Sequence, residues 1–101
     1  MIEDSTLLEA RTSLRDLLSL LREEGIDDDF PGLRHLEELL RSEPMDKGMR
    51  EAARSTYRSV YYNKEGLAHM GIWKEPYEER VRINHRLKEL SQVLLHLIDA
   101  L

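Results

Sequence analysis

The sequence contains no cysteine, and among its 101 residues it has only one phenylalanine and one tryptophan. The absence of cysteine excludes disulfide bonds and thiolate metal sites, and it removes any indication of the redox compartment. Because large aromatic residues are scarce, leucine must supply most of the core. No apolar run approaches the roughly 20 residues that a membrane-spanning helix needs, so we expect no membrane span.

The residues that are present indicate one small, highly charged domain. Charged residues make up 35% of the chain and hydrophobic residues 41%, which is typical of a helical bundle with a thin core and a solvated surface. The length fits a single domain over residues 1–101. The first residues are acidic and lack the apolar segment of a signal peptide, so we expect a cytoplasmic protein.

The strongest periodicity lies in the last third of the chain. Aliphatic residues recur there at steps of four and three, at Ile83, Leu87, Leu90, Leu94, Leu97 and Leu101. This spacing places them on one stripe of an α-helix. A stripe this apolar must be covered by other helices, so the sequence predicts a bundle organised around residues 75–101.

A second long helix is predicted over Ser5–Glu24, with leucines again at helical spacing. Thr6 followed by Glu9 has the spacing of a capping box at its start. Gly25 can end the helix in the left-handed conformation, with Ile26 making the hydrophobic contact that accompanies this ending.

Two shorter helices are predicted between the long ones. The first runs from Pro31 or Leu33 to residue 42, with the preceding aspartates as caps. The other follows Asp46 as N-cap and ends near Tyr62, and its expected inner stripe is Met49, Ala52 or Ala53, Thr56 and Val60. Residues 63–74 hold two glycines and no clear period, which indicates a loop. The predicted fold is all-α: a compact four-helix bundle with one long irregular loop before the C-terminal helix.

The net charge of −5 is unevenly distributed. Five acids stand within seven residues: Glu23, Glu24, Asp27, Asp28 and Asp29. Such a run is usually a solvated helix end. Acids are nevertheless unfavourable at a helix C-terminus, and this favours a second interpretation, an electrostatic docking site for a basic protein.

Four aromatic residues stand on either side of the predicted loop: Tyr61, Tyr62, Trp73 and Tyr77. They either close one end of the core or form a contact hot spot, because Trp and Tyr anchor protein interfaces. We include all four among the candidate partner-binding residues, together with the acidic run.

A basic stripe is predicted along the third helix, where Lys47, Arg50, Arg54 and Arg58 fall three or four residues apart. It could bind an anion or nucleic acid, or it could be a solvated face or a protein contact. The acidic total of the chain disfavours nucleic acid, which binds through clustered Lys and Arg.

The sequence offers no set of residues for catalysis or for a metal. Asp27, Asp29, Gly32 and Glu38 match part of a calcium-loop pattern, but Pro31 supplies no side-chain oxygen at a ligand position. The four histidines stand in no metal-binding or triad arrangement, and there is no glycine-rich phosphate loop. We expect no metal, no cofactor and no enzymatic activity.

One segment resembles a known family. Matching positions are Met70, Gly71, Trp73, Glu75 and Asn84, followed by the leucine-rich helix. This third of the chain is similar to the C-terminal part of a small all-helical bacterial family of uncharacterised function, some members of which look like immunity proteins beside secreted toxins. Ile72 stands where that family has a small residue, and residues 76–79 change the connection. The resemblance implies a helical fold and a toxin-neutralising role, and it carries no catalytic residues.

These observations lead to one functional hypothesis and two alternatives. The leading hypothesis is an immunity-type protein that neutralises a cognate bacterial toxin, or another basic effector, by capping it with an acidic and aromatic surface. In the first alternative, part of the stripe in residues 75–101 is buried in a homodimer. In the second, a small regulator binds nucleic acid through the stripe Lys47–Arg58.

Overall fold

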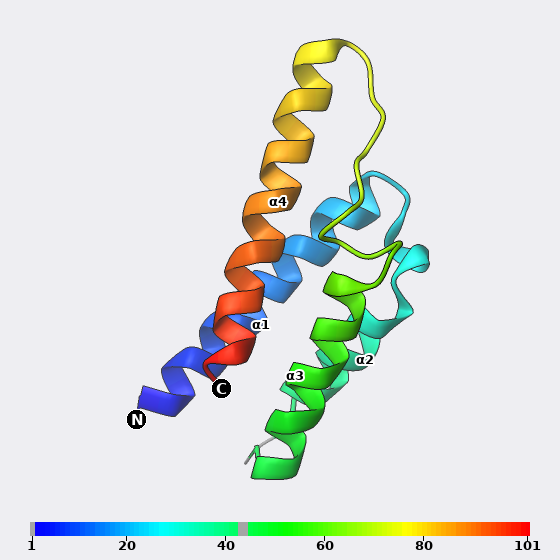
Figure 1. The fold of residues 1–101 in the computed structure, drawn as a ribbon. Helices are drawn as coiled ribbons and strands as arrows, with labels where there is room; N and C mark the ends of the chain where they lie inside the picture. Colours follow the sequence, from blue (N-terminus) through cyan, green and yellow to red (C-terminus); the bar gives the residue numbers. More distant parts are fainter. Residues whose placement is uncertain (1, 43–44) are drawn as a thin grey trace.

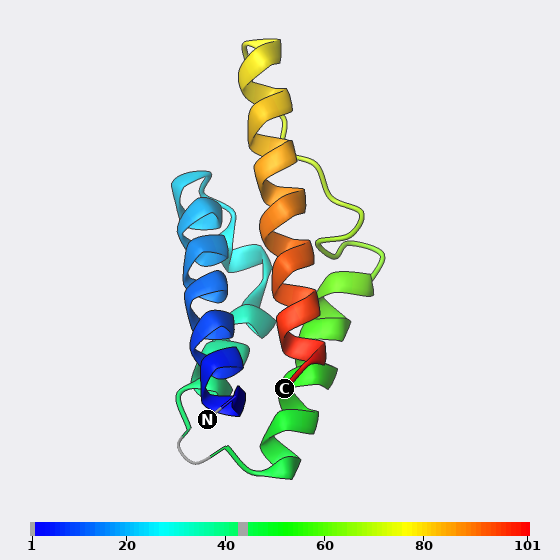
Figure 2. The ribbon, with the colours of Figure 1, turned by 90° about the vertical axis from the view of Figure 1, so that its left-hand side faces the viewer.

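The computed structural model, which describes residues 2–42 and 45–101, contains the four predicted helices, and they run alternately up and down (Figure 1). They are α1 (Ile2–Glu23), α2 (Pro31–Leu40), α3 (Lys47–Tyr62) and α4 (Tyr77–Asp99), with a short 3₁₀ turn, η1 (Asp27–Asp29), before α2. Each helix packs on the next, and α4 closes the bundle by packing on both α1 and α3 (Figures 1 and 2). The all-α four-helix bundle is therefore confirmed. None of the helices in the described residues has an apolar stretch long enough to cross a bilayer.

The core is built mainly from leucines of α1, α2 and α4. Those that are buried are Leu7, Leu14, Leu17, Leu18, Leu20, Leu21, Leu33, Leu36, Leu40, Leu87 and Leu94. On α4 the most buried line is Leu87, Ser91, Leu94 and Ile98, while Ile83, Leu90 and Leu97 are only partly buried. These three partly buried residues form one side of the predicted stripe, and they lie at the seam between α4 and α1.

The end of α1 follows the prediction, but its beginning does not. Gly25 has a φ of 72°, and its N–H donates to the carbonyl of Arg22 at 3.0 Å, while the N–H of Ile26 donates to that of Leu21 at 2.9 Å. This is the hydrogen-bond pattern of a glycine-terminated helix. The helix begins at Ile2, so Thr6 lies inside it and the predicted capping box is wrong.

Helix α3 begins as predicted. Its inner face includes Ala53 of the predicted stripe, with Met49 and Val60 partly buried, but also two buried tyrosines that the prediction left out. The carboxylate of Asp46 accepts a hydrogen bond from the N–H of Met49 at 2.8 Å, which caps the helix. Its buried residues are Ala53, Tyr57 and Tyr61. The hydroxyl of Tyr57 donates to the carbonyl of Ser91 on α4 at 2.7 Å. Burial, with a smaller contribution from Tyr61, raises the pKa of Tyr57 well above its ordinary value.

Figures 1 and 2 show that the N-terminal end of α4 projects beyond the other helices. Of the described residues outside α4, only the later part of the loop over residues 63–76 (yellow) runs beside this projecting end (Figure 1). The exposed apolar residues of the projecting end include Tyr77 and Val81. The projection brings the loop and the first turns of α4 together at one end of the molecule.

Candidate functional site

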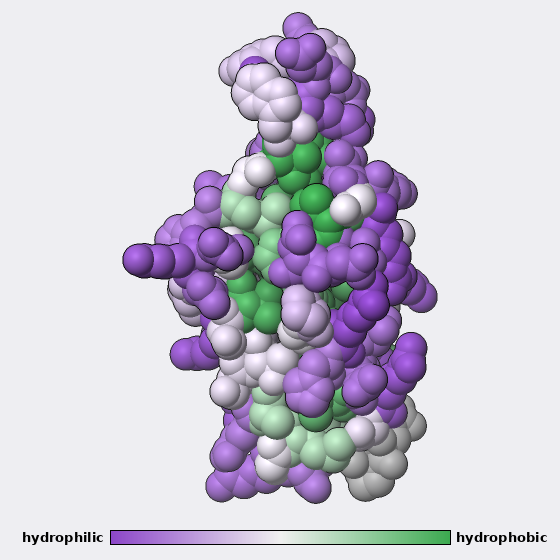
Figure 3. All heavy atoms as spheres, turned by 90° about the vertical axis from the view of Figure 1, so that its right-hand side faces the viewer, coloured by the Kyte–Doolittle hydropathy of each residue, from purple (hydrophilic) through white to green (hydrophobic). Residues whose placement is uncertain are grey.

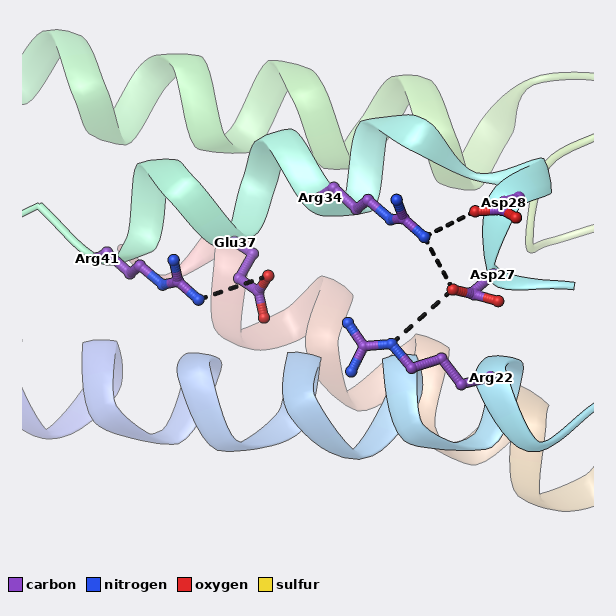
Figure 4. A network of polar contacts seen from close by, with 6 residues as sticks. All are labelled: Arg22, Asp27, Asp28, Arg34, Glu37 and Arg41. Atoms are coloured by element: carbon purple, nitrogen blue, oxygen red, sulfur yellow. Dashed lines mark hydrogen bonds and ion pairs between the residues drawn. The ribbon is translucent and has the colours of Figure 1, made fainter. Parts of the chain in front are cut away.

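Two of the three aspartates in the acidic run hold the turn onto α2. The guanidinium of Arg34 lies 3.0 Å from the carboxylate of Asp27 and 2.7 Å from that of Asp28 (Figure 4). Arg22 approaches Asp27 from α1 at 3.8 Å. The aspartates were predicted as caps of α2, but its N-cap is Phe30, without a side-chain cap. That prediction is wrong because Arg34, one turn into α2, offers the carboxylates a stronger, charged donor.

The remaining acids of the run differ in their surroundings. Glu24 is mostly buried, and its carboxylate binds the ammonium of Lys74 in the loop at 2.8 Å. Glu23 and Asp29 are exposed, and neither forms an ion pair with a residue that the structure describes. The acidic run therefore supplies two unpaired carboxylates and three that bind within the molecule.

The four candidate aromatic residues separate into two groups. Tyr61 is buried in the core, and its ring meets that of Tyr62 edge to face with 4.9 Å between centroids. Trp73 and Tyr77 are 75% and 65% exposed, and the guanidinium of Arg80 lies 3.9 Å and 5.1 Å from their ring centroids. Tyr61 thus closes the core, the first of the two expectations, while Trp73 and Tyr77 are exposed and share Arg80 as a neighbour.

The position of Trp73 is fixed by a side chain of α4. The side-chain oxygen of Asn84 accepts a hydrogen bond from the N–H of Ile72 at 2.7 Å, and its amide nitrogen donates to the carbonyls of Ile72 and Arg80, each at 2.8 Å. A primary amide presents both a donor and an acceptor, so one side chain satisfies both polar groups of Ile72. In the sequence, Asn84 stood out only as a position that matches the resembled family, and the sequence alone gave it no role.

Replacing Asn84 with alanine should release the loop. We expect the free energy of unfolding to fall by about 1–3 kcal/mol, because Ile72 is buried and both of its backbone groups lose their partner. Hydrogen exchange measured by mass spectrometry should accelerate over residues 70–76. Gln92→Ala, an exposed position on the same helix, is the control. Equal exchange in the two variants would contradict this role.

Acidic and aromatic residues distant in sequence come together around one hollow of about 590 Å³. Its charged and aromatic walls are Glu24 at the end of α1, Asp29 in η1, and Glu65 and Trp73 in the loop, and Ile72 and Phe30 also line it. We call it the acidic–aromatic hollow. From the side of the loop, Figure 3 shows apolar surface (green) below the projecting tip, flanked by hydrophilic surface (purple). Glu65 is exposed, has no ion-pair partner among the described residues, and escaped the sequence prediction.

The basic stripe of α3 is largely used within the molecule. Arg54 donates to the carbonyl of Leu101 at 2.6 Å, and Arg58 binds the carboxylate of Asp99 at 3.1 Å. The hydrogen bond that Arg58 donates to the carboxylate of Asp99 raises the pKa of Arg58. Arg50 donates to the carbonyl of Met45 at 3.2 Å. Cations favour the carbonyl-rich end of a helix, so Arg54 and Arg58 hold the last turn of α4 against α3.

Within the described part of the chain, His, Asp and Glu side chains form no group of three placed to hold a metal ion. His85 lies 3.8 Å from Glu89 on the exposed face of α4, one helical turn away.

Comparison with protein-family models, with curated proteins and with solved structures found no match.

Proposed function

We propose that this chain is a protein-binding domain that caps a basic partner through the acidic–aromatic hollow. The observation that carries the proposal is the convergence of Glu24, Asp29 and Glu65 beside the exposed ring of Trp73. A Lys or Arg side chain entering the hollow would meet carboxylates and an aromatic ring, both of which attract cations. Arg80 already packs on the Trp73 ring, which supports this chemistry.

In its sharpest form, the proposal is an immunity-type protein that neutralises a cognate bacterial toxin in the cytoplasm. It rests on the resemblance at residues 70–84 and on the position of those residues, because Gly71 and Trp73 line the hollow and Asn84 holds the loop. A negatively charged site would speed association with a cationic surface. Trp73, which is mostly exposed, would then supply apolar contact area.

The test is affinity capture from the native host, compared between variants. The native chain should retain one stoichiometric basic protein, which is lost when Asp29→Lys and Glu65→Lys are combined, and also in Trp73→Ala. Glu51→Lys, an exposed reversal on α3, should retain it. Recovery of only the chain itself, or equal recovery by every variant, would oppose the proposal.

With the purified partner, stopped-flow measurements should show slower association for the Asp29→Lys and Glu65→Lys double variant. We expect a fall of about tenfold at low salt, because charge complementarity acts mainly on the association rate. The dependence of the rate on salt should also become weaker. If the double variant keeps both the native rate and the native salt dependence, the hollow is not the docking site.

The structure favours neither alternative as strongly. Arg50, Arg54 and Arg58 donate to groups within the chain, so nucleic acid would have to compete with these contacts. Self-association through α4 would have to use the partly buried flank of its stripe. Light scattering and a labelled-DNA or labelled-RNA shift, repeated with Arg54→Glu, test these two functions directly.

A further inference from the structure

A second surface, distinct from the hollow, follows the seam between α1 and α4. Two adjoining depressions of about 400 and 550 Å³ share Asp16 and Leu90 in their linings, so they form one continuous trough. Figure 2 shows the two helices side by side along this seam. The trough extends from Leu8 and Leu97 at one end to Glu23 and Lys74 at the other. Only Glu24 also lines the acidic–aromatic hollow.

The end of the trough near Leu8 is apolar. Leu8 and Val93 are 58% and 47% exposed, and Leu90 and Leu97 are only partly buried beneath them. These residues come from two antiparallel helices, so they form a shallow cleft between ridges instead of one flat stripe. A groove between two helices can accept the apolar face of a third helix.

One wall of the trough carries a regular row of acids. Glu9, Asp16 and Glu23 stand seven residues apart on α1, and all three are exposed. A seven-residue step is close to two helical turns, so the three carboxylates lie in a line with a spacing of about 10.5 Å. None of them forms an ion pair with a described residue.

We propose that this trough binds an amphipathic helix of a partner protein, with an apolar stripe and with Lys or Arg at every seventh position beside it. The apolar stripe would enter between Leu8, Leu90 and Val93. The basic residues would pair with Glu9, Asp16 and Glu23, as charged flanking positions do in a coiled coil. A helix of about 21 residues places three such bases at positions that match the acids.

A second copy of this chain fits the trough less well. No helix of the described residues presents Lys or Arg at three successive seven-residue intervals. Pairing two copies through the apolar end would also bring its acids, Glu9, Asp16 and Glu89, near those of the partner, and like charges oppose association. Lys74, Arg82 and Arg86 line the other end of the trough. Among the described residues, the apolar end is lined by Glu9, Asp16 and Glu89 and by no base, so charge complementarity selects a basic helix there.

The test uses two designed 21-residue helical peptides and fluorescence anisotropy. Both carry the same leucine stripe. The first has lysine at three positions seven residues apart, and the second has glutamate at those positions. We expect the native chain to bind the lysine peptide about tenfold more tightly, because three exposed ion pairs replace three like-charge contacts.

The combined reversal Glu9→Lys, Asp16→Lys and Glu23→Lys should invert that preference. Asp16→Lys alone should shift it in the same direction by a smaller factor. The matched control reverses the same number of exposed acids elsewhere, Glu38→Lys, Glu51→Lys and Glu78→Lys, and should keep the native preference. Circular dichroism verifies that each variant is folded.

Three outcomes would overturn the proposal. One is equal binding of the two peptides by the native chain. Another is a preference for lysine that survives the α1 reversal. The third is a native dimer, seen by sedimentation, that Leu8→Glu dissociates, because a second copy would then occupy the trough. None of these variants alters Asp29, Glu65 or Trp73, so the result is independent of the hollow.

Discussion

Replacing Gly66 with alanine is expected to lower the free energy of unfolding by about 3 kcal/mol or more. Gly66 is buried where the chain leaves α3. A β-carbon there would collide with the carbonyl oxygen of Val60 and would lie 2.8 Å and 2.9 Å from those of Tyr61 and Asn63. All three are backbone atoms, which cannot rotate away as a side chain can.

The collision would also break the ending of α3. The N–H groups of Leu67 and Ala68 donate to the carbonyls of Val60 and Tyr61 at 3.1 Å and 2.9 Å. These bonds satisfy carbonyls that a helix end leaves unpaired. Any shift that accommodates a methyl group at Gly66 must lengthen them.

Urea unfolding followed by circular dichroism measures the effect. Gly48→Ala is the control, because the added β-carbon at this exposed position lies 3.4 Å from one carboxylate oxygen of Asp46. Among the described residues it meets no backbone atom outside its own helix within 4 Å. It should leave stability unchanged or raise it by up to about 1 kcal/mol, since alanine favours a helix over glycine. Similar losses in both variants would show that close approach to Gly66 is not the cause.

Raising the pH above about 10, where an unfolded tyrosine ionises, is expected to destabilise the protein through Tyr57. Its folded-state pKa is raised by burial, so the unfolded chain releases the proton first. The stability that the neutral hydroxyl contributes is complete below pH 10 and is lost as the pH rises toward the folded pKa. The maximum slope for one proton is about 1.4 kcal/mol per pH unit.

Tyr57→Phe should remove that slope. At neutral pH we expect it to cost about 1–2 kcal/mol, because the carbonyl of Ser91 loses a buried donor at 2.7 Å. Unfolding free energies measured between pH 8 and about 11.5 should therefore converge for the two chains. Tyr62→Phe, which removes an exposed hydroxyl from the same helix, is the control. Parallel curves for the native chain and Tyr57→Phe would contradict the assignment.

The elements with strong periodicity could be predicted from the sequence. The leucine spacing predicted both α1 and α4, and Gly25 and Asp46 marked helix boundaries through local backbone chemistry. The inner face of α3 was predicted only in part, because it depends on a partner far away in the chain. Tyrosine is amphipathic, so the sequence could not show that Tyr57 faces inward. There the carbonyl of Ser91 on α4 accepts a hydrogen bond from its hydroxyl.

The candidate site shows the same division. The acids and Trp73 were identified because a charge run and a rare aromatic are visible in sequence. Their separation into paired and unpaired carboxylates depends on Arg34 and Lys74, and no sequence period reports these pairings. Glu65 was missed because a single acid in a loop gives no signal until folding places it beside Asp29.

The contact between Asn84 and Ile72 has a consequence for how freely the sequence can vary. Both hydrogen bonds at position 72 use backbone atoms, so a library randomised there should return many apolar residues. A library randomised at position 84 should return asparagine almost alone, because glutamine is one methylene longer and aspartate lacks the donor. The location of the loop is thus specified by a helix residue twelve positions downstream, and redesigns of the loop need to preserve that distant amide.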